Sequence, residues 1–286
     1  MLFVNPNSGG GKAARASLAE RSRERGIEAV VLEPGSDLAA LAAEQVELGA
    51  DALGVAGGDG SLAVVAAVAL EAGLPFVCVP AGTRNHFALD LGVDRRDLVG
   101  ALDAFTEAVE RQIDVAEVNG RLFLNNLSLG LYGDAVQQPG YRDAKLRTLI
   151  ETARAVHGPS GGAPELCVED DRGRVHRHPA VVLVSNNPYA IQRPVVTGTR
   201  TTLNSGRLGI LLVDPPSERK GTAARAWTAR EVSIEAAGPV RAGVDGEAVE
   251  LLPPLRIVSR PDALRVRISA RHPGVSPAGT LPPSGP

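Results

Sequence analysis

The sequence predicts an α/β domain followed by a mostly antiparallel β-sandwich domain. Short apolar runs alternate with helical patterns as far as about residue 110, which is typical of a Rossmann-like, doubly wound parallel sheet. Beyond that point the helical patterns give way to short apolar runs separated by hairpin signals, as in antiparallel sheets. The length of 286 residues is also more than one compact core usually needs. We expect the first domain over residues 1–111, the second over 112–272 and a disordered tail over 273–286.

The first domain contains four strand patterns that alternate with helical patterns. Residues 36–49 show the clearest helix boundaries, with Ser36 or Asp37 as the N-cap and Gly49 as the stop. The expected strands cover residues 2–4, 27–32, 52–56 and 74–80, and the expected helices cover 13–26, 36–49, 61–71 and 94–110.

The second domain is marked by three turn signals. Asn119-Gly120, Arg172-Gly173 and Asp245-Gly246 each separate two short runs, which predicts β-hairpins. A helical pattern at 141–158 has a narrow apolar stripe beside basic side chains, so it suits either packing on the β domain or contact with anionic lipid. A second helix is expected near 217–228, and further strands are expected at 180–186, 207–213, 231–237 and 264–270.

Composition narrows the class of protein. Hydrophobic residues make up 44% of the chain, which excludes wholesale disorder, and the formal net charge of −3 provides no general attraction to nucleic acid. Cys78 and Cys167 lie in apolar runs and are expected to be buried thiols in a reducing compartment. The chain starts without a signal-peptide pattern, and its longest apolar run, 62–70, is too short to span a bilayer. We therefore expect a cytoplasmic protein that can still touch the inner face of a membrane.

Three loops rich in small residues follow strands of the first domain: NPNSGGGK (5–12), GGDGS (57–61) and PAGTRNH (80–86). The carboxyl ends of parallel strands meet at one edge of a sheet, where the N-termini of the following helices favour an anion. One glycine loop is usually only a turn, but three at one edge favour phosphate binding. Asp59 would repel a phosphate, so it suits Mg²⁺ binding or proton acceptance, and it could also cap the following helix.

These three motifs, in this order and spacing, resemble the diacylglycerol kinase catalytic family, and GVDGE (243–247) matches a fourth motif. That family includes bacterial lipid kinases, sphingosine kinases and ceramide kinases, and it is distantly related to NAD kinases. The resemblance implies a nucleotide-binding first domain, a lipid-binding second domain, ATP as phosphoryl donor and Mg²⁺ as metal. It extends from the N-terminus to about residue 270.

The resemblance also implies roles for individual residues. Asp59 would bind metal or act as a base, and Glu247 is the candidate general base on the lipid hydroxyl. Asp245-Gly246 taken alone reads as a type I′ turn, and Lys12 is either a phosphate contact or an exposed lysine at a helix start. The residues implied to surround the nucleotide are Asn5, Ser8, Gly9, Lys12, Gly57, Gly58, Gly60, Ser61, Gly82, Thr83, Asn85 and His86.

The sequence departs from the family pattern at two places. His86 stands where the family usually has an aspartate, and a neutral imidazole is a poor ligand for Mg²⁺. His86 could instead bind phosphate directly, or Asp90, one helical turn later, could supply the metal oxygen, or the site could have decayed. Ser205 and Gly209 replace two further aspartates, which weakens the case for a structural metal site.

The function that we expect is therefore an ATP- and Mg²⁺-dependent lipid kinase acting on a hydroxyl such as that of diacylglycerol. An NAD kinase-like enzyme and a non-catalytic lipid- or nucleotide-binding relative stay open as alternatives. The expected partners are the lipid and, transiently, a membrane surface, and a homodimer is compatible with the sequence. His176 and His178 are expected on one face of a strand, as an exposed polar face rather than a zinc site.

Overall fold

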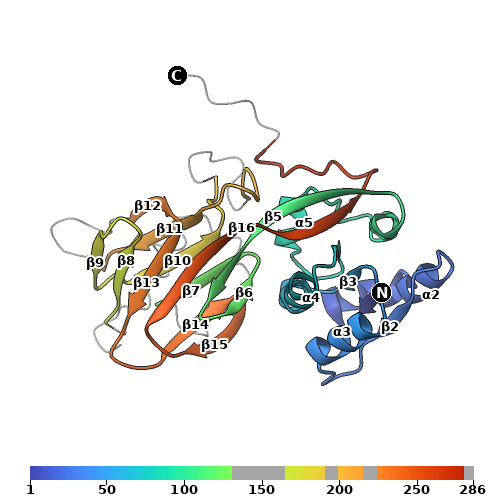
Figure 1. Ribbon diagram of the computed structural model, residues 1–286, viewed down its shortest axis with the longest axis horizontal. Helices are drawn as coiled ribbons and strands as arrows, with labels where there is room; N and C mark the ends of the chain where they lie inside the picture. The colour runs from blue at the N-terminus through green and yellow to red at the C-terminus, as the bar shows by residue number, and fades with distance from the viewer. Residues whose placement is uncertain (131–164, 191–198, 216–223, 280–286) are drawn as a thin grey trace. The chain divides into compact units, whose positions relative to one another are not determined.

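A computed structural model of the chain describes residues 1–130, 165–190, 199–215 and 224–279 (Figure 1). The chain forms two compact units. The first comprises Met1–Asp114, Thr201–Asn204 and Asp262–Pro286, and the second comprises Val115–Arg200 and Ser205–Pro261. These units do not follow the expected linear division at residues 111 and 272, because the chain returns to the first unit at its C-terminal end.

The first unit is built on a parallel sheet with the strand order β2-β1-β3-β4. Its strands are β1 (Leu2–Val4), β2 (Ala29–Val31), β3 (Leu53–Ala56) and β4 (Phe76–Val79). The last part of β16 (Leu255–Ser269) adds a further parallel strand, with Val266 opposite Phe76. Strand order reverses at β1, so loops from β1 and β3 leave in opposite directions at this point of the sheet, where open α/β sheets bind ligands.

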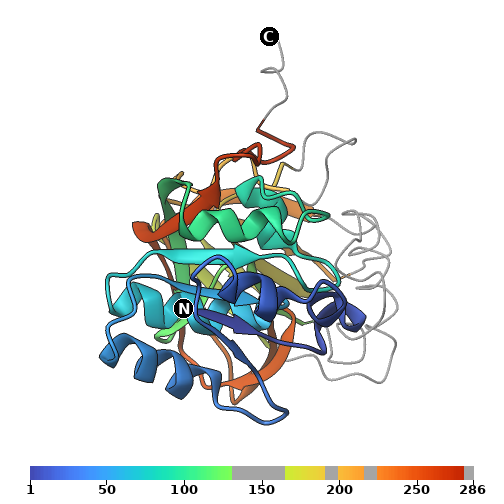
Figure 2. The ribbon, with the colours of Figure 1, turned by 90° about the vertical axis from the view of Figure 1, so that its right-hand side faces the viewer.

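Helices connect these parallel strands. Right-handed crossovers place α1 and α2 on one face of the sheet and α3 and α4 on the other, and Figure 2 shows helices on both sides of the blue and cyan strands. The expected doubly wound α/β fold is confirmed. The bounds are η1 Ser8–Gly10, α1 Lys12–Arg15, α2 Leu18–Arg23, α3 Leu38–Glu47, α4 Asp59–Glu71, α5 His86–Leu91 and η2 Gly100–Phe105.

Some local expectations for this unit are confirmed. Asp37 caps α3, since its Oδ1 accepts a hydrogen bond from the Ala40 amide at 3.1 Å. The helix after the second glycine loop ends at Glu71 as expected. Cys78 is a buried free thiol in β4, whereas Cys167 is only half-buried.

Two helix predictions are wrong. The expected helix at 13–26 is interrupted at Ser17, whose φ of +47° is left-handed. The expected helix at 94–110 is the short 3₁₀ helix η2 followed by β5 (Ala108–Val118). Asp97 accepts a hydrogen bond from the Gly100 amide at 2.8 Å, and β5 pairs with β16, so local capping and a distant strand determine this segment.

The second unit is an antiparallel β-sandwich of two sheets. One contains β6 and the order β16-β13-β8-β9, with β5 pairing both β16 and β6, and the other has the order β12-β11-β10-β7-β14-β15. Apolar side chains from both sheets, such as Val232 and Ile257 from one and Leu127 and Ile210 from the other, form one buried cluster. The bounds are β6 Arg121–Phe123, β7 Asn126–Leu129, β8 Cys167–Asp170, β9 Val175–Arg177, β10 Val181–Asn186, β11 Leu208–Val213, β12 Ala224–Ala229, β13 Glu231–Glu235, β14 Val240–Val244 and β15 Glu247–Leu251.

The three hairpins of this unit are confirmed as β5–β6, β8–β9 and β14–β15. The helix expected near 217–228 is wrong for residues 224–228, which belong to β12 and pair with β11. The helix expected at 141–158 lies outside the described residues. Within the described residues, no helix is both long enough and apolar enough to cross a bilayer.

His176 does not belong to the exposed polar face that the sequence suggested. Its ring stacks on Trp227, with 4.6 Å between the centroids, and the Arg174 guanidinium lies 5.3 Å from the Trp227 ring centroid. His178 is exposed and leaves the strand with a φ of +53°, so the two histidines do not form a pair on β9. Desolvation, and next the charge of Arg225, lower the pKa of His176.

This lowered pKa predicts that acid destabilises the second unit. The unfolded chain takes up a proton near the ordinary value of about 6.5, whereas the folded state resists protonation of His176. The contribution of His176 to stability is thus complete above that value and is lost as the pH falls below it. We expect the difference in unfolding free energy between the unmodified protein and His176→Gln to decrease from pH 7 to pH 5, measured by urea denaturation. A difference that does not vary with pH would contradict this.

Candidate functional site

The three glycine-rich loops of the first unit contact one another through their backbones. The first loop (5–12) follows β1, the second (57–61) follows β3 and the third (80–86) follows β4. A Cβ added to Gly9 would lie 2.3 Å from the Ala81 carbonyl oxygen, and one added to Gly82 would lie 2.7 Å from the Gly58 Cα. Only glycine permits these approaches, so the first loop packs on the third and the third on the second.

The first loop has an unusual backbone. Gly9, Gly10 and Gly11 have φ values of +57°, +69° and +85°, a run of left-handed residues that side chains disfavour. Asn5 anchors the start of the loop, because its amide donates to the Ala56 carbonyl at 3.0 Å and its Oδ1 accepts from the Asn7 amide at 3.1 Å. Successive backbone N–H groups in a turn can form a concave anion site, which suits the expected phosphate role.

Lys12 connects two of these loops. Its Nζ donates to the Gly82 carbonyl at 3.0 Å, so the side chain is half-buried rather than extended into solvent. An ammonium group carries three donors, and this bond uses one of them. Lys12 thus fixes the third loop while its positive charge stays beside the glycine loops. Ser8 and Ser61 are half-buried and Thr83 is exposed.

Asp59 is the buried acid of this site, with 7% of its surface exposed. It is the first residue of α4, and the N-cap is Gly58, so the alternative role of Asp59 as a helix cap is wrong. One of its oxygens lies 3.4 Å from the amide of Phe87, in the first turn of α5. Burial, and secondarily the Asp59 carboxylate, raise the pKa of Cys78, which indicates that the two groups are close. The Asp59 carboxylate is therefore part of the loop region and is much less exposed to solvent than a surface acid.

Asn85 holds the third loop in shape. It is buried with a φ of +52°, and its Nδ2 donates to the carbonyls of Pro80 and Gly82 at 2.9 and 2.8 Å. Its Oδ1 is buried and has no hydrogen-bond partner among the described residues. His86 is half-buried as the first residue of α5, and Asp90 is buried one turn later, as the sequence predicted.

Asp245 and Glu247 belong to the second unit. Asp245 and Gly246 have φ values of +47° and +88° and form the two-residue turn between β14 and β15, as expected for type I′. The buried Asp245 carboxylate also accepts three backbone hydrogen bonds of 2.8–3.0 Å from residues 124–126. Glu247 is exposed, and its carboxylate lies 3.2 Å from the Arg121 guanidinium. Glu247 therefore directly follows the turn, and the hydrogen bonds of Asp245 hold the turn against residues 124–126.

Arg200 is a residue of this region that the sequence did not reveal. It is fully buried and donates to the carbonyls of Leu124 and Asn186 at 2.6 and 2.8 Å and to the Asn125 side chain at 3.0 Å. It therefore holds the same segment, 124–126, that Asp245 holds. No motif marks Arg200, because its partners lie 14 to 76 residues away in the chain.

Ser205 and Gly209 stand where the family pattern has aspartates, and their surroundings suit the residues present. A Cβ at Gly209 would lie 2.6 Å from the Pro188 Cα and 2.6 Å from the Ser185 Oγ, so this position has no room for a side chain. Ser205 donates from its amide and its hydroxyl to the Asn187 Oδ1 at 2.8 and 2.5 Å. Within the described residues, no group of three or more His, Cys, Asp or Glu side chains is arranged to hold a metal.

Comparison with known proteins gives consistent similarities. Residues 1–118 match the family described as "Diacylglycerol kinase catalytic domain". The chain is 27% identical to a "Probable lipid kinase YegS-like" of Pseudomonas aeruginosa, over 96% of this chain and 95% of the relative. It is 33% identical to a "Diacylglycerol kinase" of Mycobacterium tuberculosis over 41% of this chain and 39% of the relative. The fold is similar to that of a putative diacylglycerol kinase from Bacillus anthracis, with a TM-score of 0.69, 20% identity and coverage of 94% and 96% of the two chains.

Proposed function

We propose that the protein transfers the γ-phosphoryl group of ATP to a lipid hydroxyl, from the premise that residues 1–118 match the family described as "Diacylglycerol kinase catalytic domain". Diacylglycerol is the substrate that we propose first. The observation that carries the proposal is the contact among three glycine loops, the second of which contains the buried Asp59. In an ordinary turn, a glycine need not contact another loop. Here Gly9 lies against the third loop and Gly82 lies against the second.

The glycine loops fit a triphosphate. Phosphate oxygens need close approach to backbone N–H groups and a nearby positive charge. Gly10 of the first loop is exposed and Gly58 of the second is half-buried, whereas Gly82 is buried, and the Lys12 ammonium lies beside them. We propose that the first and second loops hold the phosphates and that Gly82 and Thr83 lie near the nucleotide. Asn85 contributes by shaping the third loop, since both protons of its amide are used inside that loop.

We propose that Asp59 and Asp90 hold Mg²⁺ together with the phosphates. Mg²⁺ prefers hard oxygen ligands and is commonly bound by one or two carboxylates plus substrate phosphates. Both side chains are buried in the first unit, one at the start of α4 and one in α5. When bound, the metal neutralises charge on the transferring phosphoryl group.

Glu247 is the proposed general base for the lipid hydroxyl. Its exposed carboxylate can accept a proton, and the rigid turn at Asp245-Gly246 limits the positions that it can adopt. Phosphoryl transfer demands mainly positioning and charge neutralisation, so these residues need no covalent role. Contact with a membrane surface is part of this proposal, because the substrate is a lipid, whereas a homodimer is not required.

The decisive experiment incubates the protein with ATP labelled at the γ-phosphate, Mg²⁺ and a total lipid extract. A labelled phospholipid with the mobility of phosphatidic acid supports the proposal. Labelled product from NAD but from no lipid would instead favour the NAD kinase-like alternative. Lipid or nucleotide binding without any transfer, in parallel with an active control kinase, would favour a non-catalytic relative.

His86→Asp tests whether the departure from the family pattern is an adaptation. We propose that His86 acts on phosphate as a donor, so a carboxylate at this position adds repulsion near a polyanion. The expected result is a lower rate of lipid phosphorylation and weaker binding of Mg-ATP. The matched variant His86→Asn keeps a donor and is expected to retain more activity. A higher rate of lipid phosphorylation in His86→Asp would instead show that the histidine impairs the site.

A further inference from the structure

The chain beyond β16 lies against the first unit, where the sequence predicted a disordered tail. We call residues 271–279 the C-terminal strap. Ser276 and Ala278 are 4% and 2% exposed, so the strap is packed rather than loose. The expectation of disorder from residue 273 is therefore wrong for residues 273–279, because side chains of low hydrophobicity are buried by contacts with distant residues.

The strap packs directly on the end of α5. The Gly274 amide donates to the Gly92 carbonyl at 3.0 Å, and the Arg111 guanidinium donates to the Gly274 carbonyl. Gly92 is the C-cap of α5 with a φ of +75°, and a Cβ there would lie 2.1 Å from the Val275 amide nitrogen. The glycine that ends α5 is thus also the surface on which the strap rests.

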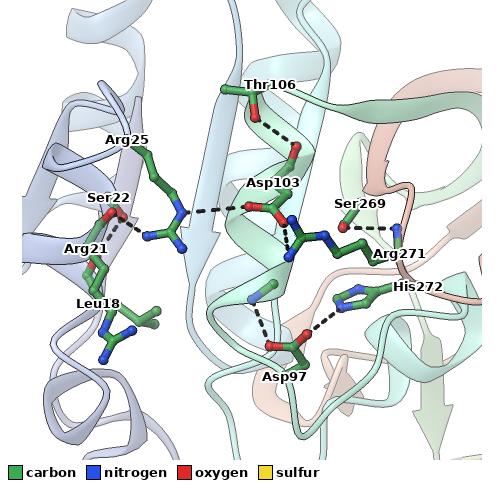
Figure 3. A network of polar contacts seen from close by, with 11 residues as sticks. Leu18, Arg21, Ser22, Arg25, Asp97, Asp103, Thr106, Ser269, Arg271 and His272 are labelled. Atoms are coloured by element: carbon green, nitrogen blue, oxygen red, sulfur yellow. Dashed lines mark hydrogen bonds and ion pairs between the residues drawn. The ribbon is translucent and has the colours of Figure 1, made fainter.

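A second contact joins the strap to the segment after α5. The His272 Nε2 lies 3.5 Å from the Asp97 Oδ2, while the Asp97 Oδ1 accepts from the Gly100 amide (Figure 3). Next to it, Arg271 and Arg25 approach the Asp103 carboxylate at 3.2 and 3.7 Å. The His272 side chain is 3% exposed and the Asp97 side chain is 47% exposed, so this contact joins a buried imidazole of the strap to a carboxylate at the surface.

The two segments that the strap contacts, α5 and the residues after it, themselves contact the glycine loops. From the segment after α5, the Arg95 guanidinium donates to the Arg84 carbonyl in the third loop at 2.9 Å. From α5 itself, the Phe87 amide approaches the Asp59 carboxylate at 3.4 Å, and the Phe87 ring packs against Phe76 of the sheet. The strap therefore touches the two segments that position the third loop and the amide facing Asp59.

We propose that the C-terminal strap is a positioning element of the site, with His272 as its principal positioning residue. It holds α5 and residues 92–97 in place, and through them it fixes the third loop beside Asp59. Without the strap, α5 keeps only six residues and loses the partner at its C-cap, so its position relaxes. The effect on nucleotide binding rests on the proposed function, whereas the effect on the order of α5 does not.

The test uses the full chain with His272→Leu and two matched variants. His272→Gln keeps an N–H donor toward Asp97 and is the conservative rescue. Arg267→Leu removes an ion pair between β16 and Glu110 of β5, outside the strap, and is the control. Amide hydrogen exchange of residues 84–92 is measured without nucleotide, and affinity for Mg-ADP is measured by calorimetry.

We expect His272→Leu to speed exchange at residues 84–92 and to weaken Mg-ADP binding severalfold, His272→Gln to restore both, and Arg267→Leu to change neither. Faster exchange confined to residues 271–279, or spread evenly over the first unit, would overturn the proposal. If the exchange pattern is as expected but neither the unmodified protein nor any variant binds Mg-ADP, the positioning role of the strap is supported and the proposed function is contradicted. Should His272→Leu not fold, Asp97→Asn gives the same comparison, because its Oδ1 can still accept from Gly100.

Discussion

Asp59→Asn is expected to reduce phosphoryl transfer to lipid by about 10²-fold or more while the protein stays folded. The amide has the shape of the carboxylate and can still accept from the Phe87 amide, so packing at the start of α4 is retained. It lacks the charge needed to bind Mg²⁺ or to accept a proton. The measurement is the initial rate with labelled ATP and lipid, with the unfolding midpoint recorded beside it.

Asp37→Asn is the matched control for this change. Asp37 is an acid of the same unit that caps α3, far along the chain from the glycine loops, and asparagine caps a helix as well as aspartate does. Its rate is expected to equal that of the unmodified protein. Full activity in Asp59→Asn would contradict the proposed role of this carboxylate. A large decrease in the rate of Asp37→Asn would instead indicate a general loss of stability.

Gly9→Ala is expected to abolish nucleotide binding and to destabilise the first unit more than Gly10→Ala does. Both glycines have left-handed φ values, so each substitution costs roughly 1–2 kcal/mol of backbone strain. A Cβ at Gly9 would lie 2.3 Å from the Ala81 carbonyl oxygen, whereas one at Gly10 would meet nothing within 4 Å. Only the change at Gly9 therefore forces the first and third loops apart.

The two glycine variants serve as controls for each other. Urea denaturation gives the stability of each, and calorimetry gives the affinity for Mg-ADP. Gly10→Ala is expected to lose stability by the strain alone and to keep measurable binding. Equal affinities in the two variants would mean that contact between the first and third loops is not needed for the site.

The convergence of the loops is the part of the site that the sequence predicts best. Parallel strands place the segments after β1, β3 and β4 at one edge of a sheet whatever the details of the loops, so periodicity and glycine spacing suffice. The partners within the site are a different matter. Lys12 to the Gly82 carbonyl and Phe87 to Asp59 are contacts across 70 and 28 residues, and no local pattern encodes them.

Three failures of sequence reasoning share one physical cause, contacts between residues that are distant in the chain. Residues 94–110 have a helical pattern, but the strand pairing of β5 with β16, almost 150 residues later, outweighs local propensity. The C-terminal segment lacks an apolar period, yet Ala278 is buried and Gly274 bonds to Gly92, on a surface that exists only after the first unit has folded. His176 looks like an exposed polar residue until Trp227, 51 positions away, stacks on it.

The sequence by itself determined the two fold classes, the order of the first four strands along the chain, the hairpin at Asp245-Gly246 and the three loops that carry the family pattern. These features depend on residue spacing and on turn chemistry, which act over a few residues. Only the tertiary structure decided that Asp59 is buried beside Phe87, that Arg200 and Asp245 hold one segment, and that the C-terminal strap rests on Gly92. Those contacts join residues distant in the chain, and their stability comes from packing and hydrogen bonds that form once the units have folded.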